Sequence, residues 1–120
     1  MATITPTFTK LRGPAGGIDA MVVTWAGLIG TGDVGAAIQR PDLGDRSAQV
    51  VATWGGGTVV VEGSNDGTNW FTLTSPAGTS LSFTANGLLQ VTEAVAYIRP
   101  HVTSAVTTAT ITMTLRRTMR

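Results

Sequence analysis

The chain has 120 residues, enough for one domain with little room for a second. Charged residues make up 12% of it and the net charge is +1, which argues against a nucleic-acid binder with a concentrated basic face, while the 42% hydrophobic share argues against disorder. It has no Cys and one His, which excludes disulfides, thiolate zinc sites, Cys nucleophiles and a His-based metal cluster within one subunit.

The composition favours strands over helices. Thr and Val are abundant, and these β-branched residues suit a pleated surface. No apolar run approaches the ~20 residues that cross a bilayer. The first residues show neither the charged start nor the apolar core of a secretory signal, so we expect a protein used as made. Composition thus predicts a small all-β domain outside the membrane.

The first strand-like segment is residues 3–10, where Thr occupies every odd position. Ile4 and Phe8 share one face of this alternation. Pro6 excludes a central strand, because it cannot donate a hydrogen bond to the sheet ladder. The segment therefore predicts an extended N-terminal arm or an edge strand.

A Gly- and Pro-rich break at residues 13–17 separates this segment from the rest of the chain. The predicted organisation is an extended arm at residues 1–12 and a β-sandwich domain at residues 13–120. An apolar face exposed on a monomer is a liability, so we expect the arm to pack on a neighbouring subunit or a partner. The candidate partner contacts are Ile4, Phe8, Lys10 and Arg12.

Turn signals recur about every ten residues along the remaining chain, which is typical of a sandwich or barrel. No segment has a convincing helical period, and we expect residues 36–45 to be a long loop with at most one short strand. The predicted strands are 21–25, 47–54, 58–62, 70–74, 80–84, 88–93, 96–103 and 108–116. We predict a single-domain antiparallel β-sandwich of jelly-roll type.

The segment Ser-Asn-Asp-Gly-Thr-Asn at residues 64–69 predicts a tight turn, with Gly67 at a positive φ. Of the two aromatic residues that follow it, alternation sends one into the core. We expect that one to be Phe71, because Leu73 points the same way. Trp70 is then expected to face Tyr97 and Arg99 or to lie half-exposed over the turn.

The sequence offers no constellation for acid–base or nucleophilic catalysis. The carboxylates lie mostly in expected loops, where they cap turns. The one histidine, His101, follows Arg99-Pro100 in a strand pattern, as a structural residue does. The triple glycine at residues 55–57 precedes a strand and lacks the helix N-terminus of a phosphate loop. We expect a protein that is not an enzyme and uses no metal or cofactor.

Two charged residues lie inside apolar strand patterns. Glu62 ends the most apolar predicted strand, and Arg99 lies in the predicted strand 96–103. Burying either charge alone is costly, so one interpretation makes Glu62 and Arg99 an ion pair. The other interpretation places both at strand ends in water.

The segment Glu-Gly-Ser-Asn-Asp-Gly-Thr-Asn-Trp-Phe-Thr-Leu at residues 62–73, with Ala-Tyr-Ile-Arg-Pro at residues 96–100, resembles the hairpin and strand of discoidin-type, galactose-binding-like jelly rolls. This likeness covers about a third of the chain and concerns residues that are mainly structural in that family. Ala96 stands where that family has its first Arg, and the flanking Cys pair is absent. The resemblance implies a jelly-roll fold and leaves ligand binding open.

The layout of nearly the whole chain resembles small virion proteins of tailed bacteriophages, which include capsid decoration, or cement, proteins. The resemblance lies in the Thr-rich arm, Val-Thr-Trp-Ala-Gly-Leu at residues 23–28 with Gly-Asp at residues 32–33, Arg-Pro-Asp-Leu-Gly-Asp-Arg-Ser at residues 40–47 and the hairpin. It implies a non-enzymatic protein on the outer surface of a phage head, made in the host cytoplasm. Its partner would be the major capsid protein, and we expect a homotrimer, with a dimer as the second possibility.

The alternative function is a carbohydrate-binding jelly roll of a phage tail or surface protein. Its candidate ligand platform is Trp70 and Tyr97, whose rings stack on sugars, together with Asp66. Many evenly spaced copies on the shell would favour the cement protein, and few copies at the tail would favour the sugar binder.

Overall fold

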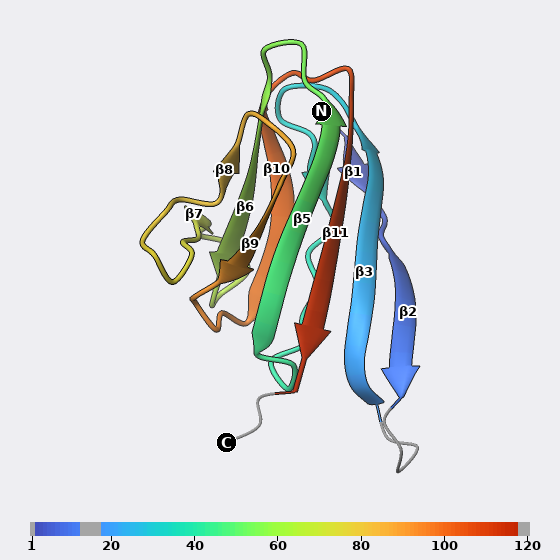
Figure 1. Ribbon diagram of the computed structural model, residues 1–120, viewed down its shortest axis with the longest axis vertical. Helices are drawn as coiled ribbons and strands as arrows, with labels where there is room; N and C mark the ends of the chain where they lie inside the picture. The colour runs from blue at the N-terminus through green and yellow to red at the C-terminus, as the bar shows by residue number, and fades with distance from the viewer. Residues whose placement is uncertain (1, 13–17, 118–120) are drawn as a thin grey trace.

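The computed structural model describes residues 2–12 and 18–117, all of whose regular elements are strands (Figure 1). One sheet has the order β2-β3-β11-β5-β9, and the other has the order β1-β4-β10-β6-β7, with β8 also paired to β6. The strands are β1 (Thr3–Ile4), β2 (Thr7–Arg12), β3 (Ile18–Leu28), β4 (Val34–Gly35), β5 (Asp45–Thr53), β6 (Thr58–Ser64), β7 (Phe71–Thr72), β8 (Ser82–Phe83), β9 (Gly87–Val91), β10 (Tyr97–Ser104) and β11 (Thr108–Arg116).

The predicted jelly-roll sandwich is confirmed. From β3 to β6 the chain alternates between the two sheets, β7 and β8 stay in the second sheet, and β9, β10 and β11 alternate again. This order winds consecutive strands across the sandwich, as a jelly roll does. Figure 1 shows the β2-β3-β11-β5-β9 sheet in front of the β10-β6-β7 strands. Neighbouring strands pair antiparallel, and β1 with β4 is the parallel exception among the described strands.

The core lies between the sheets and is made by alternate residues of the long strands. On β11, the inward residues Ile111, Met113 and Leu115 are fully buried, as their alternation with threonines predicted. Trp25 of β3 is also fully buried, and its indole Nε1 donates a hydrogen bond to the Ala36 carbonyl at 3.0 Å. This bond satisfies the one polar atom of the largest core side chain.

The N-terminal segment belongs to the sandwich, which corrects the division into an arm at 1–12 and a domain at 13–120. β1 pairs with β4 in one sheet, and β2 pairs along most of its length with β3 in the other. The chain changes sheets between these strands, at Thr5-Pro6. Ile4 and Phe8 therefore lie in different sheets and share no face. The edge-strand interpretation describes β2, which borders its sheet.

Candidate functional site

The turn between β6 and β7 is organised by Asp66. Its Oδ1 accepts hydrogen bonds from the backbone N–H groups of Thr68 and Asn69 and from the Ser64 hydroxyl, each at 2.8 Å, and its Oδ2 accepts one from Asn69 Nδ2 at 2.8 Å. The backbone bonds from Asn69 and Thr68, followed by the side-chain bonds, hold the pKa of Asp66 well below its usual range. Gly67 has a φ of 76°, as the turn chemistry predicted.

The aromatic platform suggested by the sequence is brought together on the outer face of the β1-β4-β10-β6-β7 sheet, but its members are engaged with one another and with the turn. The Arg99 guanidinium covers one face of the Trp70 ring, 3.9 Å from its centroid. The Tyr97 ring packs beneath Gly67, close enough that a Cβ there would meet it at 3.5 Å. Since the oxygens of Asp66 bond within the turn, these three residues form a structural cluster.

The cluster continues into the charged residues of the same face. Glu62 Oε1 accepts a hydrogen bond from Arg99 Nε at 2.7 Å, so Glu62 and Arg99 are ion-paired. The other oxygen, Oε2, lies 3.2 Å from Nδ1 of His101. The Glu62 side chain is only 9% exposed, and its two partners supply the compensation that a shielded carboxylate needs. His101 thus has a structural position beside Glu62.

Phe71 is exposed, so its predicted entry into the core is wrong. The residue is 70% exposed, whereas Leu73 is 3% exposed. Phe71 pairs with Gly63 at the border of the sheet, where β7 is only two residues long. The space over Gly63 is filled by Leu73 and Val95, since a Cβ on Gly63 would meet Val95 Cγ2 at 2.5 Å and Leu73 Cδ2 at 2.9 Å. No room is left there for a phenyl ring.

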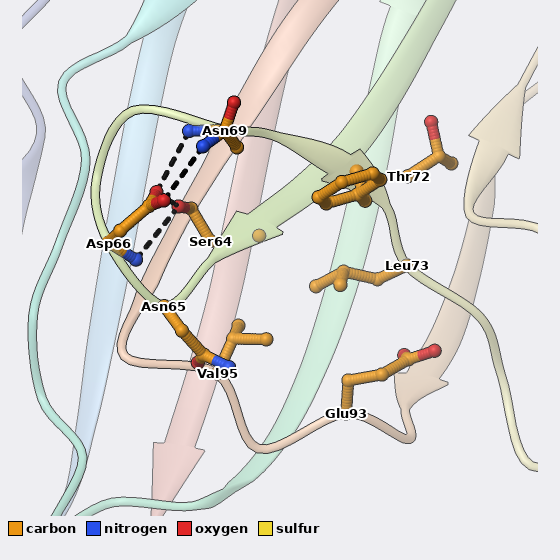
Figure 2. A pocket seen from close by; sticks show the side chains of 10 residues that line it. Ser64, Asn65, Asp66, Asn69, Thr72, Leu73, Glu93 and Val95 are labelled. Atoms are coloured by element: carbon orange, nitrogen blue, oxygen red, sulfur yellow. Dashed lines mark hydrogen bonds between the residues drawn. The ribbon is translucent and has the colours of Figure 1, made fainter.

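A pocket of about 360 Å³ opens beside Phe71, between the turn and the segment that joins β9 to β10 (Figure 2). In Figure 2, Ser64, Asp66 and Asn69 gather on one side, Glu93 lies at the opposite end, and the apolar side chains of Leu73 and Val95 lie between them. Its lining residues are Gly63, Ser64, Asn65, Asp66, Asn69, Phe71, Thr72, Leu73, Glu93 and Val95. The pocket thus combines an apolar floor with a polar rim.

Several rim groups are held by bonds within the protein. Both Glu93 oxygens accept from Thr74, from its N–H at 2.9 Å and its hydroxyl at 2.7 Å. Partial burial alone would raise the pKa of Glu93, but these bonds outweigh it, and the pKa is lowered. Asn65 Oδ1 accepts from Ala96 N–H at 3.1 Å. Glu93 is therefore ionised at neutral pH, and within the described part of the chain the amide nitrogen of Asn65 has no hydrogen-bond partner.

The candidate arm contacts have different environments. Ile4 is partly buried and packs against the core, so only part of its surface remains open to a partner. Phe8 is 52% exposed, and Lys10 is also exposed. The side chain of Arg12 lies outside the described part of the structure. Of the four candidates, Phe8 and Lys10 are thus placed at the surface.

The outer face of the β2-β3-β11-β5-β9 sheet carries neutral side chains across all five strands. Strand pairing sets Thr112 between Thr24 and Gln49, and these two pair in turn with Thr7 and Leu88. We call this surface the threonine face, and its residues are Thr7, Thr9, Val22, Thr24, Ser47, Gln49, Val51, Leu88, Gln90, Thr110, Thr112 and Thr114. None of these side chains is charged, and the paired charged residues Asp45 and Arg116 border the face at one end.

Sequence reasoning missed both the pocket and the extent of the threonine face. The alternating threonines of β11 were a visible signal for one strip of that face. Its width depends on which strands become neighbours, and the pocket depends on a loop far away in the chain. Among the described residues, no cluster of three or more His, Cys, Asp or Glu side chains is placed to hold a metal ion. The same part of the chain contains no helix capable of spanning a membrane.

No protein-family model matches this chain, and no curated protein matches it. Among solved structures, it is similar to the SPBc2 prophage-derived protein YomS, with a TM-score of 0.62 and 10% identity over 80% of this chain and 93% of that one. It is also similar to a Klebsiella pneumoniae protein with a double-stranded β-helix domain, with a TM-score of 0.50 and 14% identity over 94% of this chain and 73% of that one. At these identities the chain shares a fold with both proteins, an all-β jelly roll.

Proposed function

We propose that this chain is a non-enzymatic structural protein of a phage virion, a capsid decoration protein that binds the outer head surface and braces neighbouring major capsid subunits. The observation that carries this proposal is the threonine face, a neutral surface that runs across five strands. A surface without charge can be covered by another protein without desolvating ions. The fold shared with a prophage-derived protein supports a phage-related role.

A structural role also agrees with how the polar residues are used. Asp66, Glu93 and Asp33 bond to nearby N–H and O–H groups, and Glu62 is paired with Arg99 and His101. These contacts hold turns and loops in place. On a capsid, many copies with several contacts each would convert weak single contacts into durable attachment.

The experiment places a charge at the centre of the threonine face. Thr112→Lys is expected to abolish binding of the purified protein to capsids that lack it, because the lysine charge would have to be desolvated in the contact. Thr103→Lys, at an exposed position on β10 in the other sheet, is the matched control. Electron microscopy of the decorated heads should show regularly spaced copies on the shell. Capsid binding by Thr112→Lys equal to that of wild type would contradict the role of this face.

We further propose self-association, with a trimer favoured over a dimer. Pairing through the border strand β2 is disfavoured, because Lys10 lies opposite the buried Met21, on the core-facing side of that strand. An inward-facing lysine on an edge strand opposes the addition of another strand. If the subunits associate through another surface, light scattering should show the same oligomer for wild type and for Lys10→Thr. A protein that is a strict monomer, both free in solution and on capsids, would overturn the proposal.

A further inference from the structure

The pocket beside Phe71 has the features of a small-ligand site that is separate from the threonine face. It joins an exposed aromatic ring, an apolar floor and neutral hydrogen-bonding groups within about 360 Å³. This volume lies within the range of pockets that hold small ligands. We propose that it binds one pyranose ring of a neutral saccharide.

The aromatic contact would come from Phe71. A pyranose presents a face of C–H groups, which packs on an aromatic ring and removes apolar surface from water. Phe71 is 70% exposed, so most of its surface is free for such a contact. Trp70, in contrast, has one face covered by Arg99. Leu73 and Val95 extend the apolar surface beneath the bound ring.

The rim supplies partners for sugar hydroxyls. Asn65 and Thr72 line the pocket, and neither the amide nitrogen of Asn65 nor the hydroxyl of Thr72 has a partner within the described part of the chain. Asp66 and Glu93 line it as well, both as carboxylates held ionised by their hydrogen bonds. Two negative charges at the rim disfavour an anionic ligand, which is why the ligand is a neutral sugar.

The pocket walls are held in place before any ligand arrives. The carbonyl of Val95 accepts a hydrogen bond from Arg46 Nη1 at 3.0 Å, and the next residue, Ala96, donates its N–H to Asn65. The opposite wall is fixed by the four bonds to Asp66. A site whose walls are already ordered loses little entropy on binding.

The test uses the full chain and four methyl glycosides, those of galactose, glucose, mannose and N-acetylglucosamine. Backbone NMR shifts of residues 65, 69, 71 and 95 should saturate with at least one of them, with a Kd on the order of 1 mM, as a single ring contact allows. N-acetylneuraminic acid, which is anionic, should bind less tightly than the best neutral glycoside.

Variants then separate Phe71 from other aromatic residues. Phe71→Ala should weaken binding about tenfold or more, whereas Phe71→Trp should retain it, since the ring contact is preserved. Phe8→Ala removes an exposed phenyl group from the other sheet and is the matched control, with unchanged binding expected. Unchanged binding in Phe71→Ala, or shifts centred on Trp70 and Tyr97, would overturn the proposal.

The experiments can reject the saccharide site and the capsid role independently of each other. Phe71→Ala should still decorate capsids, and Thr112→Lys should still bind the glycoside with wild-type affinity. If no glycoside gives saturable shifts while decoration is intact, the saccharide site is rejected and the capsid proposal remains. If the glycoside binds but the wild-type protein does not decorate capsids, the capsid proposal is rejected and the saccharide site remains.

Discussion

The guanidinium group of Arg99 lies over the Trp70 ring, 3.9 Å from the ring centroid, and also donates a 2.7 Å hydrogen bond to Glu62. Trp70 follows the Asp66 turn, and Arg99 lies on β10, so this contact attaches the turn to the centre of its sheet. The Trp70 ring also shields the ion pair of Arg99 and Glu62 from water at the outer surface of the sheet. The cluster is therefore expected to stabilise the hairpin.

Trp70→Ala should lower the free energy of unfolding by about 1–3 kcal/mol, because Arg99 loses its ring contact and the partly buried pair with Glu62 becomes more exposed. Urea denaturation followed by circular dichroism measures the change. Trp70→Phe, which keeps a smaller ring, should recover part of the loss. A Trp70→Ala variant as stable as wild type would show that the ring adds nothing to the ion pair.

Phe71→Ala should change the free energy of unfolding by about 0.5 kcal/mol or less, in the range of ordinary surface substitutions. The reason is that Phe71 is 70% exposed and has little buried surface to lose. Leu73→Ala is the paired control two residues away, and its loss should be about 2–5 kcal/mol, since Leu73 is in the core. Similar losses in both variants would mean that Phe71 is buried in solution.

Arg46 is the charged residue whose replacement should cost most. It is 3% exposed and donates to three backbone carbonyls, those of Leu43 at 3.1 Å and of Arg40 and Val95 at 3.0 Å. Arg46→Met removes the donor from the carbonyls of Leu43 and Val95, whereas the Arg40 carbonyl still accepts from the Leu43 N–H at 3.0 Å. We therefore expect a loss of about 3 kcal/mol in urea denaturation. Arg46→Lys keeps the charge but lacks the planar guanidinium, so its stability should lie between those of wild type and Arg46→Met.

Gly35→Ala tests the packing beneath Trp25. A Cβ at Gly35 would lie 2.4 Å from Trp25 Cδ1 and 2.7 Å from Pro100 Cδ, and both rings are rigid. The sheets must separate locally, at a cost of about 1–3 kcal/mol in thermal or urea unfolding. Gly30→Ala is the control, since its nearest contact would be Asp33 Oδ1 at 3.4 Å. Equal stability of the two variants would contradict this packing.

Stability should fall in acid, and Asp33 should contribute to the fall. Hydrogen bonds from the N–H groups of Gly30, Ile29 and Ala2 lower the pKa of Asp33 in the folded state. A carboxyl group whose pKa is lowered on folding stabilises the folded state at pH values above its unfolded-state pKa of about 4. This stabilisation is lost as the pH falls through the folded-state pKa. The urea midpoint of wild type should therefore decline below about pH 4, and Asp33→Asn should decline less steeply. If the urea midpoints of wild type and Asp33→Asn declined in parallel as the pH is lowered, a contribution from Asp33 would be excluded.

The sequence by itself determined most of the long strands and the inward face of β11. Ile111, Met113 and Leu115 alternate with threonines, and this period of two is a property of any extended chain, so it predicts the buried side without knowledge of the fold. The turn at Asp66 could be predicted for a similar reason, because the side-chain chemistry of Asn, Asp and Gly acts on the backbone within a few residues. Such local rules were sufficient for the class of fold.

Only the tertiary structure decided which strands became neighbours and what covered their ends. Alternation predicts that Phe71 and Leu73 point to the same side. It contains no information on Gly63, which pairs with Phe71, or on Val95, which fills the space over Gly63 from a loop two strands later. In the same way, Ile4 and Phe8 share a face only if the chain continues in one sheet, and at Pro6 it changes sheets. The pocket and the threonine face both arise from contacts between distant segments, which depend on packing across the whole sandwich and therefore leave no local signal.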